Sequence, residues 1–176
     1  LHLGTINSYE FMYTVSEKLN AMNPDVILLA GDIIDEDLGP VIKYDVGEHL
    51  RRLKAKYGVY AVTGNHEYIG GAEPAVEYLS KHDINVVRDN AVKVDNAFYV
   101  VGREDRSSRQ FGGKRRKELS DILTDVDKSL PVIMMEHQPF NLEQAAQNGV
   151  DLQLSGHTHN GQLWPFNYIV EKVYEL

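Results

Sequence analysis

The side chains that could do chemistry in this sequence are aspartate, asparagine and histidine residues gathered in short segments, most of which contain glycine. With His2 near the start of the chain, four such segments follow: Gly31-Asp32, Gly64-Asn65-His66-Glu67, Glu136-His137 and Gly156-His157-Thr158-His159. Their oxygen and nitrogen atoms suit Mn²⁺, Fe or Zn²⁺ rather than soft metals. The sequence contains no cysteine, which excludes thiolate metal sites, disulfides and cysteine nucleophiles.

The spacing within these segments suits side chains that must reach one point. Glycine precedes Asp32, Asn65 and His157, and it lets the backbone turn sharply so that the next side chain can enter a crevice. His157 and His159 alternate, so both imidazoles point to one side if that segment is extended. A lone histidine is more often structural, but this many metal-ligand side chains favour one shared metal centre.

Each of the four segments follows an apolar run that predicts a buried strand. The runs cover residues 26–30, 59–63, 131–135 and 150–154, and shorter strands at a sheet edge or in a second sheet are expected at 84–87, 91–94 and 97–101. Helices are expected over about residues 10–22, 41–56, 72–81, 114–125 and 141–148. This alternation predicts one α/β domain with a largely parallel sheet. Such sheets bind ligands beyond the carboxyl ends of their strands.

Several other side chains are assigned by spacing or by their neighbours in the sequence. The predicted inner faces of the first two helices consist of Phe11, Val15, Leu19 and Met22, and of Leu50 and Leu53. His49 and His82 have polar neighbours and are expected to face solvent. The apolar segment 163–170 is expected to cover the core, with exposure or contact with an amphiphilic substrate as alternatives.

Composition narrows the function further. The chain has 176 residues, of which 43% are hydrophobic and 25% charged, as in an ordinary globular domain. Its net charge of −8 argues against a large footprint on nucleic acid or on an anionic membrane. A nuclease is disfavoured for the same reason. No apolar run approaches the roughly 18 residues of a membrane-spanning helix.

Taken in order, these segments resemble the motifs of the calcineurin-like metallophosphoesterases. The family pattern DxH, GDxxD, GNH(D/E), H and GHxH is matched by Leu1-His2, Gly31-Asp32-Ile33-Ile34-Asp35, Gly64-Asn65-His66-Glu67, His137 and Gly156-His157-Thr158-His159. The resemblance implies an α/β metallophosphatase-like α/β/β/α sandwich, with two mixed, largely parallel sheets flanked by helices. The continuation Asn160-Gly161-Gln162 resembles a bacterial branch that includes lipid-precursor phosphodiesterases and often carries an N-terminal signal or membrane anchor.

The resemblance also implies a dinuclear metal-dependent phosphoesterase that hydrolyses a phosphomonoester or a phosphodiester. Two Mn, Fe or Zn ions would share a hydroxide that attacks phosphorus in line. The first ion would be held by His2, Asp32, His159 and an aspartate before Leu1, and the second by Asp32, Asn65, His137 and His157.

His66 is the implied general acid that protonates the leaving oxygen, a task that suits an imidazole. The alternative is that His66 only braces the turn. Glu67 and Asp35 are expected to hold their loops rather than to take part in the chemistry. A protein that keeps this fold as a binding module without turnover is the second functional hypothesis.

The resemblance also bears on the two ends. The aspartate of DxH would stand before Leu1, and the family domain usually continues beyond GHxH with further strands. We therefore expect residues 1–176 to be a single metallophosphoesterase domain truncated at both ends, and weakly active. A preceding segment could provide membrane association, so the expected location is either cytoplasmic or membrane-associated and exported.

The expected substrate is a small or lipid-linked phosphoester, not a nucleic acid. A basic cluster could bind its second phosphate or an anionic headgroup, or form a solvated loop: Arg103, Arg106, Arg109, Lys114, Arg115 and Arg116. Of these, Arg103 and Arg106 are taken as substrate-binding candidates. Tyr68 could line the pocket or pack beneath it.

Overall fold

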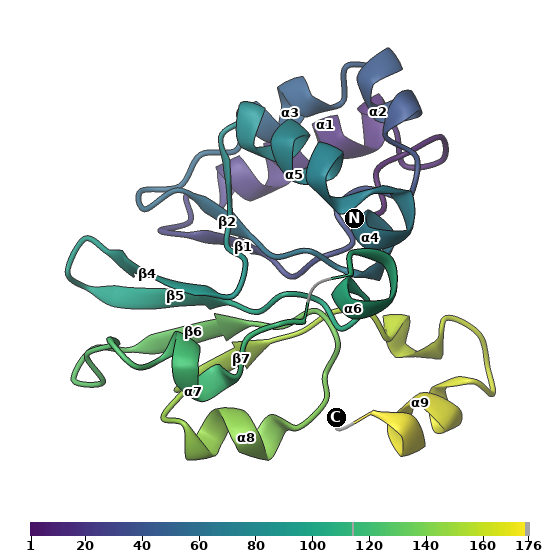
Figure 1. Ribbon diagram of the computed structural model, residues 1–176. Coiled ribbons are helices and arrows are strands. Elements are labelled where there is room, and N and C mark those ends of the chain that lie inside the picture. The colour runs from purple at the N-terminus through teal and green to yellow at the C-terminus, as the bar shows by residue number, and fades with distance from the viewer. Residues whose placement is uncertain (114, 175–176) are drawn as a thin grey trace.

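The computed structural model describes residues 1–113 and 115–174, which form two β-sheets stacked between helices (Figure 1). The first sheet consists of β1 (Ile27–Leu29), β2 (Val59–Ala61) and β3 (Ile84–Val86). All three strands are parallel in the order β1-β2-β3, with Leu28 in register with Tyr60 and Tyr60 with Asn85. The carboxyl ends of β1 and β2 therefore meet at one edge of the sheet.

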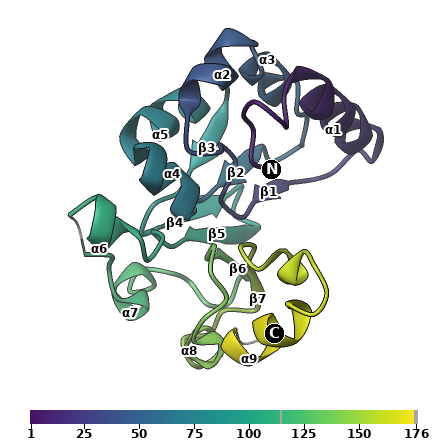
Figure 2. The ribbon, with the colours of Figure 1, turned by 90° about the vertical axis from the view of Figure 1, so that its right-hand side faces the viewer.

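The second sheet is mixed. It has the strand order β4-β5-β6-β7, made of β4 (Asn90–Val94), β5 (Phe98–Gly102), β6 (Val132–Met135) and β7 (Leu152–Leu154). Strand β4 is antiparallel to β5, whereas β5, β6 and β7 are parallel. The carboxyl ends of β5, β6 and β7 therefore also lie at one edge, close to that of the first sheet (Figure 2).

Helices cover the outer faces of both sheets (Figure 1). Over the first sheet lie α1 (Tyr9–Ala21), α2 (Leu38–Lys43), α3 (Gly47–Arg51) and α5 (Ala72–Lys81). Over the second lie α7 (Leu119–Ile122) and α8 (Leu142–Gln147). The remaining helices follow strand ends or the last motif: α4 (Asn65–Gly70), α6 (Ser108–Phe111), the 3₁₀ turn η1 (His159–Gly161) and α9 (Asn167–Val173). This arrangement confirms the predicted α/β/β/α sandwich.

Three buried apolar clusters correspond to the three interfaces between these layers. Successive side chains of a strand point to opposite faces, so β1, β2, β4, β5 and β6 each contribute to two clusters. In β6, Met134 packs with the residues under α7 and α8, whereas Met135 packs between the two sheets with Tyr60 and Val100. This alternation also decides where Glu136 and His137 point.

Two predicted helix spans are wrong. The span 41–56 is broken into α2 and α3 at Asp45, whose φ of 53° is left-handed. The span 114–125 contains only α7, and Lys114 lies outside the described residues. Residues before α7 are held instead by tertiary bonds, since the Lys117 backbone N–H donates to Asp89 at 2.6 Å. The pattern of apolar residues contains no signal for such a bond.

The predicted inner face of the first helix is wrong at its two ends. Phe11 and Met22 are 39% and 74% exposed, while Met12 and Ser16 are fully buried. The Ser16 hydroxyl donates to the Tyr13 carbonyl at 2.8 Å, so a polar side chain can occupy the buried face without losing a hydrogen bond. Leu50 and Leu53, predicted to face inward from the second helix, are both in the core, although Leu53 lies beyond the end of α3.

Three further expectations about exposure are corrected. His49 is completely buried, with its ring 4.1 Å from that of Tyr9, and His82 is half-buried with Nδ1 2.8 Å from the Tyr78 carbonyl oxygen. The apolar tail does not cover the core, since Trp164 is 80% exposed. Its neighbours are exposed as well: Leu163, Phe166, Tyr168 and Ile169. None of the described helices combines the length and the apolar character needed to cross a membrane.

Candidate metal centre

The structure brings His and Asp side chains from four strand ends and the N-terminal segment into one cluster. Among the described residues, three groups of candidate ligand atoms lie within 4.8 Å of one another, and two of them include Asp32: His2, Asp32 and His159, and Asp32, His137 and His157. The third group is His2, Asp35 and His66. The sequence predicted these side chains as ligands of two ions, and the two groups that share Asp32 contain the histidines predicted for each ion. Asn65, predicted for the second ion, is a lining residue of the cavity that also contains His2, His157 and His159.

Asp32 occupies the position between the two groups. Its backbone is left-handed, with a φ of 48°, which turns the side chain into the space beyond β1. Oδ1 accepts the His66 backbone N–H at 3.0 Å. Oδ2 lies 3.0 Å from His137 Nε2 and 3.6 Å from His2 Nε2. One carboxylate oxygen therefore faces a histidine of each group.

The tautomer of His137 favours a cation at this point. Its Nδ1 lies 2.7 Å from the Ala30 carbonyl oxygen, which only accepts, so Nδ1 carries the proton and donates. In the neutral ring, Nε2 then presents a lone pair toward the Asp32 carboxylate. His137 Nε2 and Asp32 Oδ2 are only 3.0 Å apart. Two facing lone pairs require a proton or a metal ion between them. This backbone bond is also how metal-ligating histidines are commonly oriented.

Two buried side-chain atoms in this cluster have incomplete partners. Asn65 Oδ1 has no hydrogen-bond partner among the described residues, and His137 Nε2 faces only the Asp32 carboxylate at 3.0 Å. Both atoms can donate an electron pair to a metal. Buried polar atoms are normally paired, so unpaired ones need an explanation. Coordination of a metal ion would satisfy both, and the residues present therefore fit a divalent metal.

The His2 side of the cluster is more open. His2 Nε2 lies 3.0 Å from His159 Nε2, and Gln162 Nε2 lies 3.1 Å from His159 Nδ1. His159 is exposed and begins the turn η1, with a φ of 48°. The segment from His157 to His159 is therefore not extended as expected. Both imidazoles still reach the cluster, because their left-handed backbones turn them inward.

The glycines before Asp32 and Asn65 are needed because other residues of the cluster lie too close to their Cα atoms for a side chain. A Cβ on Gly31 would lie 2.6 Å from His137 Nδ1, and the φ of Gly31 is +83°. A Cβ on Gly64 would overlap Asp32 Oδ1. Glycine at position 31 therefore leaves room for the His137 ring, and glycine at position 64 leaves room for the Asp32 carboxylate.

Glu67 joins the two strand ends from beneath. Its buried carboxylate accepts backbone N–H groups of both turns, at 2.7–3.1 Å: Asp32, Ile33, Ile34 and Gly64. Burial raises the pKa of Glu67, while these hydrogen bonds oppose the rise. Its expected role in holding the turn is confirmed by these bonds.

His66 faces a carboxylate that sequence reasoning assigned to the loop. Asp35 Oδ1 lies 2.8 Å from His66 Nδ1 and 3.5 Å from His2 Nδ1. The ring of His66 stands nearly perpendicular to that of His2, with centroids 4.5 Å apart. The sequence analysis expected Asp35 to hold its loop, and the contacts of its carboxylate with His66 and His2 were not predicted.

The charges of the cluster are coupled. Burial acts to raise the pKa of Asp32, but the contact with His137 and the His66 backbone N–H outweigh it and lower this pKa to about 2. Burial acts to lower the pKa of His137, but Asp32 raises it. Burial lowers the pKa of both His2 and His157. The carboxylate thus stays ionised, and the two less paired imidazoles favour the neutral form that binds metal.

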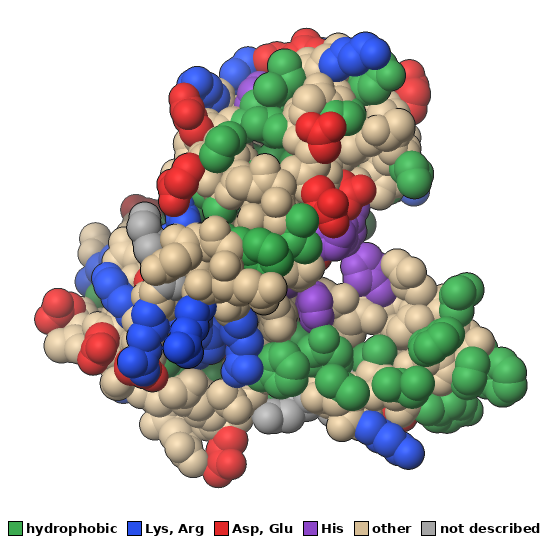
Figure 3. Space-filling model, turned by 45° about the vertical axis from the view of Figure 1, so that its right-hand side comes forward, with side chains coloured by type: hydrophobic (Ala, Val, Ile, Leu, Met, Phe, Trp, Pro, Cys, Tyr) green, Lys and Arg blue, Asp and Glu red, His purple; other side chains and the backbone are tan. Residues whose placement is uncertain are grey.

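Two adjoining cavities open onto the cluster. One of about 510 Å³ is lined by His2, Asn65 and His66, and one of about 320 Å³ reaches His137 and His157 from the other side. Figure 3 shows the histidine side chains gathered in a hollow between the upper and lower parts of the molecule, with carboxylates beside them. A phosphate ester therefore has access to the candidate ligands.

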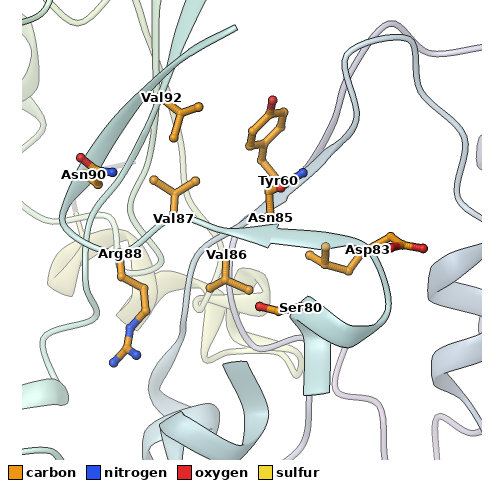
Figure 4. A pocket seen from close by; sticks show the side chains of 10 residues that line it. Tyr60, Ser80, Asp83, Asn85, Val86, Val87, Arg88, Asn90 and Val92 are labelled. Atoms are coloured by element: carbon orange, nitrogen blue, oxygen red, sulfur yellow. The ribbon is translucent and has the colours of Figure 1, made fainter. Parts of the chain in front are cut away.

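A larger cavity of about 740 Å³ lies at the edge of β3 (Figure 4). Its walls include Val86, Val87 and Val92, and Figure 4 shows Val87 and Val92 on the same side. Arg88 at its rim is already bonded to Glu73 and Glu104. No group of candidate metal ligands among the described residues lies there, so this cavity is not the centre.

The three substrate-binding candidates lie outside the two cavities at the cluster. Arg103 is buried and pairs with Glu136 at 3.1 Å, and Arg106 stacks on Phe140 with its guanidinium carbon 4.4 Å from the ring centre. The Tyr68 hydroxyl, also buried, accepts from Arg88 at 3.1 Å. Tyr68 is therefore a packing residue and does not line the cavities at the cluster.

The α/β/β/α sandwich, with two ligand groups that share Asp32, is typical of proteins with the metallophosphatase fold. The family model described as calcineurin-like phosphoesterase matches residues 1–161. The chain belongs to this family. The description of the family names phosphoester chemistry as that of its members.

Curated relatives agree with this assignment. The chain is 32% identical to an uncharacterized metallophosphoesterase of Helicobacter pylori J99 over 97% of its own length and 45% of the relative's. It is 30% identical to one of Aquifex aeolicus over 97% of its length and 64% of the relative's. The chain thus spans about half to two-thirds of these proteins.

A solved structure shows the same fold. The NAD nucleotidase NadN of Haemophilus influenzae superposes with a TM-score of 0.57 and 18% sequence identity. The similarity covers 84% of this chain and 32% of that one. At this identity the comparison establishes the fold alone.

Proposed function

We propose that this chain is the catalytic part of a phosphoesterase that uses two metal ions to hydrolyse a phosphomonoester or phosphodiester. The observation that carries the proposal is the position of Asp32, whose Oδ2 lies between His137 Nε2 at 3.0 Å and His2 Nε2 at 3.6 Å. A carboxylate shared by two sets of ligands is the arrangement that a pair of adjacent ions requires.

In this proposal His2, Asp32 and His159 hold one ion, and Asp32, Asn65, His137 and His157 hold the other. Their nitrogen and oxygen atoms suit Mn²⁺, Fe or Zn²⁺. When bound, these ions supply Lewis acidity toward the phosphoryl oxygens and lower the pKa of water. The Ala30 carbonyl keeps His137 in the tautomer that coordinates, through the 2.7 Å bond to Nδ1.

His66 is proposed as the general acid. With Nδ1 turned to Asp35 at 2.8 Å, Nε2 is the ring atom left to exchange a proton in the cavity. Donation from Nε2 to the oxygen of the breaking P–O bond would release a neutral alcohol. Asp35 would orient the imidazole for that transfer through its contact with Nδ1.

The substrate is proposed to be a small or lipid-linked phosphoester. Exposed apolar side chains follow the last motif, and the ring of Tyr174 lies 5.4 Å from that of His157. An acyl chain could contact this surface while its phosphoester reaches the cavity. Hydrolysis of one phosphoester with short and long acyl chains, each below its micelle concentration, would test this, and a KM independent of chain length would contradict it.

Metal stoichiometry and turnover together test the main proposal. Purified protein stripped with a chelator should take up two Mn²⁺ per chain and then release p-nitrophenol from p-nitrophenyl phosphate or bis-p-nitrophenyl phosphate. A single ion per chain would contradict the dinuclear centre. Two ions with no hydrolysis of any phosphoester tested would favour a binding module instead.

A further inference from the structure

A further cavity, of about 370 Å³, has five arginines among its lining residues. Its basic lining comes from the segment after β5, from α6 and from the residues before α7: Arg103, Arg106, Arg109, Arg115, Arg116 and Lys117. Figure 3 shows Lys and Arg side chains gathered on one part of the surface, apart from the histidines. The proposed metal centre uses none of these residues.

The cavity and the metal cluster lie on opposite sides of the same strand end. Met135, at the end of β6, packs between the sheets, and Met134 packs toward α7 and α8. By the same alternation Glu136 points to the α7 and α8 side, where it binds Arg103 and Arg116, while His137 points to Asp32. The cavity is therefore next to the metal cluster but separate from it.

The positive charge of the cavity is only partly neutralised. Glu136 is shared between Arg103 at 3.1 Å and Arg116 at 2.7 Å. Within the described part of the chain, Arg106 and Arg109 have no carboxylate partner. An anion would find several cationic groups already held in place.

Three residues that line this cavity each have a buried donor atom without a hydrogen-bond partner among the described residues. The atoms are Arg103 Nε, Arg106 Nε and Ser108 Oγ. The Arg103 side chain is only 3% exposed, and its other nitrogens bind Glu136, Gln144 and the Lys117 carbonyl. Donors left unpaired in a buried site destabilise the protein, so three together indicate a missing acceptor.

We propose that this cavity binds a phosphate-type oxyanion, in a site distinct from the metal centre. All three unpaired atoms can donate and the surrounding charge is positive, so the ligand must be anionic and rich in acceptors. Several arginine forks around one cavity suit the oxygens of a phosphate group. The anion is either a second phosphate of the substrate, which rests on the proposed function, or free phosphate.

Binding is tested first without metal. Calorimetric titration of chelator-treated protein with inorganic phosphate and with pyrophosphate, at constant ionic strength against chloride, should give saturable binding. The double variant Arg106→Gln, Arg109→Gln should weaken it by about tenfold or more, because two charge-assisted contacts are lost. Arg52→Gln, an exposed arginine elsewhere, is the matched control and should bind as the parent does. Equal affinity in the double variant, or no binding of either anion, overturns the proposal.

The variant Ser108→Ala tests whether the Ser108 hydroxyl binds the anion or only stabilises the folded protein. Since Ser108 Oγ has no protein partner in the described residues, its removal should leave the melting temperature of phosphate-free protein unchanged or higher. It should also reduce the rise in melting temperature that phosphate causes. A lower melting temperature without phosphate, together with an unchanged response to phosphate, would make Ser108 a packing residue and contradict the proposal.

Kinetics with Mn²⁺-loaded protein identify the source of the anion. If the cavity binds the substrate, the double variant should raise KM for an alkyl bisphosphate but not for the matching monophosphate. If it binds free phosphate, added phosphate should change the rates of both esters equally, and the double variant should abolish that response. If the protein hydrolyses no ester, the proposed function fails while the metal-free titration still decides the anion site.

Discussion

The two halves of the metal cluster share Asp32 but differ in burial. His137 is 1% exposed, and its ring is fixed by the Ala30 carbonyl between the two sheets. His159 is exposed and lies in a short 3₁₀ turn, and the His2 side chain is 20% exposed. One half is thus positioned by the packed interior of the sandwich, and the other by surface segments. Ligands fixed before binding lose less entropy on coordination, so we expect the buried half to hold its ion more tightly.

Asp32→Asn should have the largest effect, since it removes the charge shared by both halves. Asparagine tolerates the left-handed backbone at this position and can still accept the His66 N–H, so the fold should be kept. We expect both ions to be lost and hydrolysis to fall by several orders of magnitude. Elemental analysis after dialysis measures the ions.

Asp121→Asn, an exposed carboxylate in α7, serves as the control for a change of net charge and should keep both metals. Retention of one tightly bound ion by Asp32→Asn would show that the halves do not depend on a shared carboxylate.

The comparison is sharpened by removing one histidine from each half. His137→Ala should eliminate the tight ion and also open a cavity in the interior. His159→Ala should remove only the weaker ion and leave the fold stable, because this side chain is exposed. Mn²⁺ titration of each variant reports the two affinities. Identical residual affinities in the two variants would mean that burial does not set the order of binding.

A third change tests the close approach on which both halves depend. Gly64→Ala would place a Cβ against Asp32 Oδ1, whereas Gly156→Ala would meet its nearest atom, the Ala30 carbonyl oxygen, at 3.2 Å. Overpacking of this kind typically costs about 1–3 kcal/mol. We expect Gly64→Ala to lose stability and metal, and Gly156→Ala to lose less of both. Denaturant unfolding with and without Mn²⁺ measures the difference, and equal losses would show that the contact with Asp32 is not limiting.

The sequence predicted the strands and the candidate ligands because both depend on local patterns. Apolar runs of about five residues indicated β1, β2, β6 and β7, and each was followed by a metal-ligand side chain. The ends of helices were predicted less well where distant residues determine them. The turn at Asp45 and the bond from Lys117 to Asp89 have no equivalent in helical periodicity.

Side-chain partners across the fold were the other feature that the sequence could not predict. His49 has polar neighbours in the chain, but Tyr9 and Tyr13 of α1 cover it. Arg103 and Glu136 are 33 residues apart, and only the pairing of β5 with β6 makes them neighbours. Asp35 and His66 likewise follow different strands, so their contact depends on the packing of β1 against β2.

The smallest effect is expected from the Asp35 carboxylate, which belongs to neither of the Asp32-centred halves. Asp35→Asn keeps the shape of the side chain but removes the charge that faces His66 Nδ1, which lies 2.8 Å from Asp35 Oδ1. His66→Gln should lower turnover of an alkyl phosphoester by about 10²–10⁴-fold. Asp35→Asn should lower it by about 10–100-fold, as for removal of an orienting group. Both should retain two ions, and an aryl ester with a good leaving group should be affected far less. Loss of metal in Asp35→Asn would instead place this carboxylate among the ligands, through its 3.5 Å contact with His2.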